Sequence, residues 1–247
     1  MITLIIAGII TGTLSGFFGI GGGTILVPFL IFLGYTIKTS IGISLLQMLM
    51  ASIFGSYINS KSGLIDLKLI VPIGIGGFLG AIGSQFFIDL VSNQFLEVMF
   101  LLFLVYAFYR VLKGKSTTGN ISDFTPPNIY MLILIGALIG FFAVSIGVGG
   151  SLLLVPILVG FFHYDIKKAI ATGLFFVIFS SLSGVINFAL AGKILYFEAF
   201  TIGLSSLIGV LIGIKFGKLS RENTQKRLLL LFYGVVFLYL GYRVLSV

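Results

Sequence analysis

GIGGGTILVP, residues Gly19 to Pro28, interrupts an apolar N-terminal run with four glycines in its first five residues. Glycine inside a helix lowers the stability of that helix, because glycine loses more backbone freedom on folding than any other residue. Several glycines close together therefore predict the end of one helix and the start of another. What such a break can do depends on its surroundings.

The composition indicates a membrane protein. Of the 247 residues, 58% are hydrophobic and 9% are charged, and the mean hydropathy is +1.22. These values lie far outside those of soluble domains. Several runs approach or reach the roughly 20 apolar residues that a helix needs to cross a bilayer, without the alternation of barrel strands. We therefore expect an all-α polytopic membrane protein of the cell (cytoplasmic) membrane, in contact with lipid.

Several classes of function are disfavoured by the residues present. The chain has no cysteine and one histidine, His163, which argues against thiolate metal sites and cysteine nucleophiles. We find no nucleotide-binding motif, and we expect no metal, no cofactor and no enzymatic activity. The net charge of +8 comes from cations in the links between apolar runs, a pattern that reflects membrane orientation and not binding to nucleic acid. The first apolar run lacks a cleavage signal, so we expect it to be retained.

The chain contains an internal repeat. When Pro28 is placed on Pro156, 128 positions later, the flanking sequences match. The matched glycines include Gly8, Gly12, Gly19, Gly21 and Gly22, which fall on Gly136, Gly140, Gly147, Gly149 and Gly150. With one added residue the register continues, so that Tyr35 and Lys38 fall on Tyr164 and Lys167. We predict a first transmembrane repeat at 1–113, a polar cytoplasmic linker at 114–128 and a second repeat at 129–247.

Each repeat is expected to hold five helical segments. The predicted ranges are 2–18, 24–34, 41–59, 68–88 and 94–112, then 129–146, 152–162, 170–190, 196–216 and 227–246. The second segment of each repeat would be roughly 16 Å long, about half of a hydrocarbon core of about 30 Å. The first two segments could therefore form a hairpin that enters the membrane and returns, or together make one broken crossing.

The distribution of the 15 cations favours the hairpin. In the broken-crossing arrangement the cations divide eight against seven, whereas in the hairpin arrangement they divide twelve against three, as the positive-inside rule expects. The three on the minority side are Lys38, Lys193 and Arg243. The hairpin arrangement predicts that both termini lie on the non-cytoplasmic side and that the repeats have inverted topology, an architecture common in secondary transporters.

The glycine breaks would then meet near the bilayer centre, with the N-termini of the two short helices pointing inward. A helix N-terminus presents free N–H groups and partial positive charge, and glycine lets a ligand approach the backbone, so anion binding is favoured there. We expect Thr24 and Ser151 to cap the short helices. The alternative is that the glycines only permit close helix packing. The predicted substrate-binding residues are Gly19, Gly21, Gly22, Gly23, Thr24, Gln47, Gly147, Gly149, Gly150 and Ser151.

Gln47 is included because it is a polar residue within a predicted span, although an interhelical hydrogen bond would also explain it. Its repeat partner is Phe176, which makes the predicted site asymmetric. The seven carboxylates all fall in links or near span ends, so no mid-membrane acid is evident. Lys167 and Lys168 could steer anions at the cytoplasmic mouth, but topology alone also explains them.

The motifs GFFGIGGGTILVP (16–28), AVSIGVGGSLLLVP (143–156) and GFLGAIG (77–83) resemble those of the TauE/SafE family. The resemblance extends over nearly the whole chain and implies export of small sulfur-containing anions, such as sulfite or sulfonates. The second copy departs from the first by having Ser151 where the first has Gly23. A secondary transporter working by alternating access is therefore expected. An anion channel, or a transporter of thiosulfate, sulfate or a carboxylate, remains an alternative, and the sequence does not specify an oligomeric state.

Overall fold

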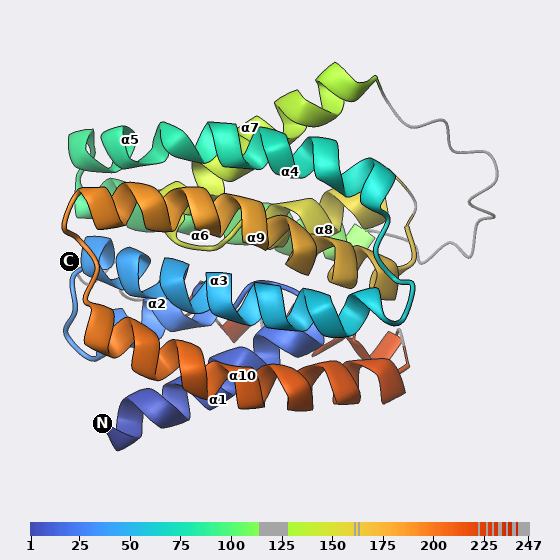
Figure 1. Cartoon of the computed structure of the whole chain (residues 1–247), viewed down its shortest axis with the longest axis horizontal. Coiled ribbons are helices and arrows are strands. Elements are labelled where there is room, and N and C mark those ends of the chain that lie inside the picture. Colours follow the sequence, from blue (N-terminus) through green and yellow to red (C-terminus); the bar gives the residue numbers. More distant parts are fainter. Residues whose placement is uncertain are drawn as a thin grey trace.

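The computed structural model describes residues 1–113, 128–160, 162 and 164–221, together with 223–225, 227–228, 230–231, 234–235, 237–238 and 241. Within these ranges the chain is helical and contains no strand, which confirms the all-α prediction (Figure 1). The helices are α1 (Ile2–Phe18), α2 (Gly23–Phe32), α3 (Ile37–Ser60), α4 (Leu67–Ile82), α5 (Ser84–Leu90), α6 (Asn93–Lys113), α7 (Ile129–Ile146), α8 (Ser151–Gly160), α9 (Ile166–Leu190) and α10 (Tyr196–Leu219). Most of the predicted linker, and His163, lie outside the described residues, as does much of the predicted segment 227–246.

Five helical stretches are long and apolar enough to cross a membrane. They are α3, α4 together with α5, α7, α9 and α10. The helices that follow the glycine breaks, α2 and α8, have 10 residues each, or about 15 Å, and this confirms that they are too short to span alone. The chain is therefore a multi-pass membrane protein.

One predicted span is divided in two. The segment expected at 68–88 is α4 followed by α5, with Gly83 between them. The Ala81 carbonyl oxygen accepts hydrogen bonds from the Asn187 amide and the Ser84 hydroxyl. Side chains that bond to a helix carbonyl compete with the backbone ladder and interrupt it, and this accounts for the division.

Glycines set the closest helix contacts. α1 packs on α10, and α4 packs on α7. A Cβ atom on Gly12 would lie 2.1 Å from the Ser206 carbonyl oxygen, and one on Gly140 would lie 2.2 Å from that of Gly77. Gly12 and Gly140 are repeat partners, so the same backbone-to-backbone packing occurs in both helix pairs. Small residues allow this approach in membrane helix bundles.

The repeat partners run in opposite directions along the bundle. In Figure 1, α3 runs from left to right, and α9, which packs against it, runs from right to left. The N-terminus lies at the left end, here called the terminal end, and α7 begins at the right end, here called the linker end (Figure 1).

Two groups of charged residues lie at opposite ends of the bundle. At the terminal end, Lys193 forms an ion pair with Asp89, and Lys38 is close enough to Asp89 for their charges to interact. At the linker end, Lys167 and Lys218 are joined by a hydrogen bond. The broken-crossing arrangement would place Lys38 at the same end as Lys167, and the fold does not.

Candidate functional site

The two glycine breaks lie against each other inside the bundle. A Cβ atom on Gly23 would lie 2.0 Å from the carbonyl oxygen of Gly147, so the start of α2 touches the end of α7. Gly21 and Gly149 both pack against the side chains of Met48 and Val177. Met48 and Val177 follow Gln47 and Phe176 directly in the sequence, and their part in this contact was missed because a repeat alignment does not show which residues touch.

The backbone of both breaks requires glycine. The φ angles are 68°, 77° and 77° at Gly19, Gly21 and Gly22, and 77°, 76° and 86° at Gly147, Gly149 and Gly150. Side-chain-bearing residues are strained in this left-handed region. Gly23 is different, since it is helical and is limited by its contacts with Gly147 and Met48.

Each break is covered by a repeat-equivalent side chain. A Cβ on Gly22 would lie 2.7 Å from Oε1 of Gln47, and one on Gly150 would lie 2.3 Å from the Phe176 ring. Both covering side chains are fully buried. One break therefore faces a carboxamide and the other an aromatic ring in the same position.

The prediction that Thr24 and Ser151 cap the short helices is wrong. The residue at the N-cap of α2 is Gly22, no side chain caps that helix, and Thr24 is its second residue. Ser151 is the first residue of α8. A capping side chain belongs to the residue before the helix, in extended conformation, and in both breaks that place is taken by a glycine with positive φ.

The hydroxyls of Thr24 and Ser151, which do not cap the helices, are buried without hydrogen-bond partners in the described structure. Among the described residues, Thr24 Oγ1, Ser151 Oγ, Thr172 Oγ1 and both amide atoms of Gln47 are inaccessible and make no hydrogen bond. A buried polar group in that condition costs about 1–3 kcal/mol. Such a cost is unusual in a packed interior and is typical of a site that receives a ligand or water.

Two serines hold the second break in place. Ser44 donates a hydrogen bond to the Gly147 carbonyl oxygen at 3.0 Å, and Ser180 donates one to that of Gly149 at 2.8 Å. Their repeat partners, Gly173 and Ala51, have no hydroxyl to hold the first break. The second break is therefore tied to its neighbours by side-chain hydrogen bonds, whereas the first faces the Gln47 carboxamide.

All ten predicted site residues lie in this central region, in or beside the two breaks. The free N–H groups at the start of α2 and α8 have no acceptor within their own helix. Together with the unpartnered hydroxyls and the Gln47 amide, they form a set rich in hydrogen-bond donors. A small anion suits such a set.

Comparison with known proteins gives the family. The family model described as Sulfite exporter TauE/SafE matches residues 4–240. The chain is 26% identical to "Probable membrane transporter protein YunE" of Bacillus subtilis (strain 168), over 97% of this chain and 95% of the relative. It is 27% identical to "Probable membrane transporter protein MJ0441" of Methanocaldococcus jannaschii, over 94% of this chain and 91% of the relative. No solved structure matches it significantly.

Proposed function

Since the chain belongs to the TauE/SafE sulfite exporter family and is a membrane transporter, we propose that it exports small sulfur-containing anions across the cytoplasmic membrane by alternating access. Sulfite and sulfonates are the proposed substrates. The proposed binding site lies between the breaks Gly19–Gly22 and Gly147–Gly150, where α2 and α8 begin.

One observation carries the proposal of an anion. Thr24 Oγ1, Ser151 Oγ and the Gln47 amide are buried in the described structure without hydrogen-bond partners, beside two helix N-termini. An oxyanion between the breaks would accept hydrogen bonds from these groups and from the free N–H groups. Backbone donors and hydroxyls hold an anion without a buried cation, which favours release as well as binding.

The duplication supports alternating access. The contacts of α1 with α10 are repeated by those of α7 with α4, and the partner helices run in opposite directions (Figure 1). We propose that the two repeats have inverted topology and that they exchange conformations to open the site to each side in turn. Under this proposal the linker end faces the cytoplasm, which its excess of cations favours.

Flux measurements in proteoliposomes test this function. Purified protein would be reconstituted and assayed with sulfite, sulfoacetate and thiosulfate, with protein-free liposomes as the control. We expect the flux of labelled anion to be saturable. Unlabelled anion on the opposite side of the membrane should accelerate it, as exchange by a carrier predicts. Absence of flux and of binding for all the anions contradicts the proposed substrate class, and unitary conductance steps in a planar bilayer contradict alternating access.

The glycines can be tested in the same assay. Replacing Gly22 or Gly150 with leucine should lower transport while membrane insertion is retained, because either side chain would collide with the covering residue and strain the backbone. Gly63→Leu is a matched control, since Gly63 also has positive φ but has nothing within 4 Å of its Cβ position. Normal transport by both leucine variants would mean that the glycines of the two breaks serve helix packing and not substrate binding.

A further inference from the structure

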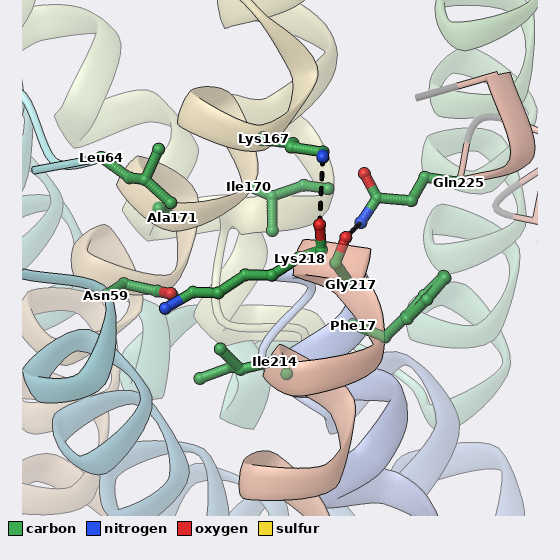
Figure 2. A pocket seen from close by; sticks show the side chains of 11 residues that line it. Phe17, Asn59, Leu64, Lys167, Ile170, Ala171, Ile214, Gly217, Lys218 and Gln225 are labelled. Carbon is green, nitrogen blue, oxygen red and sulfur yellow. Dashed lines mark hydrogen bonds between the residues drawn. The ribbon is translucent and has the colours of Figure 1, made fainter. Parts of the chain in front are cut away.

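A pocket with charged and amide side chains in its lining lies at the linker end (Figure 2). It lies where the start of α9 and the end of α10 meet the ends of α1 and α3. Lys167 and Lys218 supply its charge, and Asn59 and Gln225 are among its other lining residues (Figure 2). No described residue that lines it carries a carboxylate.

The two lysines are held in the pocket by weak, neutral partners. Lys167 Nζ donates a hydrogen bond to the Lys218 carbonyl oxygen at 3.3 Å (Figure 2). Lys218 Nζ donates to the Ser62 hydroxyl at 2.6 Å, and both bonds are exposed. The nearby Asp165 side chain accepts from the backbone N–H groups of Lys167 and Lys168, where it caps α9. Two ammonium groups therefore share one pocket.

The repeat places an equivalent arrangement at the terminal end, and there a carboxylate is present. Lys38 is the repeat partner of Lys167, and Asp89, 129 positions before Lys218, is the partner of Lys218. Asp89 forms an ion pair with Lys193 and accepts a hydrogen bond from Gln85. The terminal end thus carries a carboxylate among lysines, whereas the linker end has Lys218 in place of that carboxylate and Leu64 in place of Lys193.

We propose that the linker-end pocket is an entry site for a small oxyanion, which binds between Lys167 and Lys218. The proposal rests on the proposed function for the identity of the anion, but its charge requirement comes from the pocket itself. The site would collect substrate from the cytoplasm before the anion moves to the glycine breaks.

Two buried amides complete the site. Asn59 and Gln225 are only 4% and 2% exposed. Gln225 Nε2 donates to the Gly217 carbonyl oxygen at 3.0 Å, and its Oε1 has no partner in the described structure (Figure 2). That oxygen can accept a hydrogen bond from the hydroxyl of a singly protonated oxyanion, or from its water. The pocket therefore offers cationic donors and one acceptor.

The size of the pocket requires one side chain to move. Its volume of about 30 Å³ is room for only one or two water molecules. An oxyanion needs more room, and Lys218 can provide it by leaving Ser62, since the bond between them is exposed. Binding would thus exchange a neutral hydrogen bond for a charge-assisted one.

The test compares sulfoacetate transport by wild type, Lys167→Gln, Lys218→Gln and the double variant in proteoliposomes. We expect KM for entry from the linker side to rise about two- to fivefold per lysine, with kcat unchanged within twofold, because exposed charge interactions are screened. Lys218→Arg, which keeps the positive charge, should have a KM close to that of wild type. Raising the salt concentration should raise the wild-type KM but not that of the double variant. Lys61→Gln is the matched control, since Lys61 lies after α3 at the same end, over the Tyr57 ring.

A second measurement separates this proposal from the proposed function. We expect sulfoacetate to raise the Tm of the detergent-purified wild type more than that of the double variant, whether or not transport is observed. If wild type transports no anion, the proposed function fails and the Tm comparison decides on the pocket. Equal KM values, or an equal Tm response including none in either protein, would overturn the entry site.

Discussion

The first and second glycine breaks share a backbone and differ in chemistry. Each has three glycines with positive φ, and each is covered by a buried side chain at the same repeat position. Over the first break that side chain is Gln47, whose amide has no partner among the described residues. Over the second it is Phe176, and there two serines also hold the backbone.

This difference distinguishes the residues that helix packing requires from those that a bound substrate would require. The glycines recur in both halves because the same close contacts recur. We propose that the polar groups are distributed unequally because a ligand between the halves needs donors but does not need them in duplicate. The comparison leads to four predictions, and those on the first break should have the greater effect on transport.

The largest effect is expected from Gly23→Ala. The added methyl would lie 2.0 Å from the Gly147 backbone oxygen, which no side-chain rotation relieves. We expect transport to fall to background, and the free energy of unfolding to fall by about 1–3 kcal/mol. Ser151→Gly, at the repeat partner, creates no such collision, so we expect only the rise in KM that loss of its hydroxyl causes. Wild-type flux and Tm in Gly23→Ala would show that the two breaks can separate at no cost.

Gln47→Leu should affect transport and stability in opposite directions. Removing an unpartnered buried amide should raise the free energy of unfolding by about 1–3 kcal/mol. Transport should fall at least about tenfold, since a hydrogen bond to a charged group contributes about 1.5–3 kcal/mol. Phe176→Leu is the matched change and should lower Tm while KM stays within about threefold. Equal losses of transport in both variants would mean that Gln47 acts through packing alone.

Removing the hydroxyl of Thr24 or Ser151 should affect transport and stability in the same directions as Gln47→Leu, but by smaller amounts. Thr24→Val and Ser151→Ala each remove a buried hydroxyl that has no partner in the described part of the chain. We expect KM to rise about three- to tenfold with Tm unchanged or higher. Ser180→Ala, which removes the 2.8 Å bond to Gly149, should instead lower Tm. A fall in Tm without any change in KM for Thr24→Val and Ser151→Ala would assign both hydroxyls to structure.

The smallest effect concerns Tyr164, which donates a 2.6 Å hydrogen bond to Asp66 at the linker end. Burial, and then this bond, raise the pKa of Tyr164 above its ordinary value of 10.0. The bond therefore stabilises the fold fully below about pH 10, and its contribution is lost as the pH rises through the raised folded-state pKa. Tyr164→Phe should lower the free energy of unfolding by about 1 kcal/mol at about pH 8.

The check is Tm as a function of pH. The advantage of wild type over Tyr164→Phe should shrink as the pH rises above 10, because the tyrosine ionises more readily in the unfolded chain. Tyr35→Phe, at the repeat partner, is the control, since its hydroxyl makes no comparable bond among the described residues. A constant difference between wild type and Tyr164→Phe up to pH 11 would contradict the role of the bond.

Much of the fold could be predicted from the sequence, because hydropathy and repetition are properties of the chain itself. The two short helices and the meeting of the glycine breaks follow from segment length and from the alignment of Pro28 with Pro156. The division of α4 from α5 does not follow, since it depends on Asn187, which is distant in sequence and reaches the Ala81 carbonyl.

The sequence predicted that the two breaks meet, but it did not predict the bonding around them. Thr24 and Ser151 follow glycines, as capping residues often do, yet capping depends on the φ angle of the residue before the helix, which composition does not reveal. The covering of Gly22 by Gln47 and of Gly150 by Phe176 depends on how α3 and α9 cross the breaks. The linker-end pocket joins four helices, so no local pattern indicates it.

The central claim is that a small oxyanion binds between the two breaks. Crystals of the wild-type protein grown with selenite, a selenium analogue of sulfite, would locate that anion by anomalous scattering. We predict a selenium peak within hydrogen-bond distance of Gln47, Thr24 or Ser151, and its loss in crystals of Gln47→Leu. A well-occupied selenium peak elsewhere in the bundle, with no peak between the breaks, would contradict the central claim.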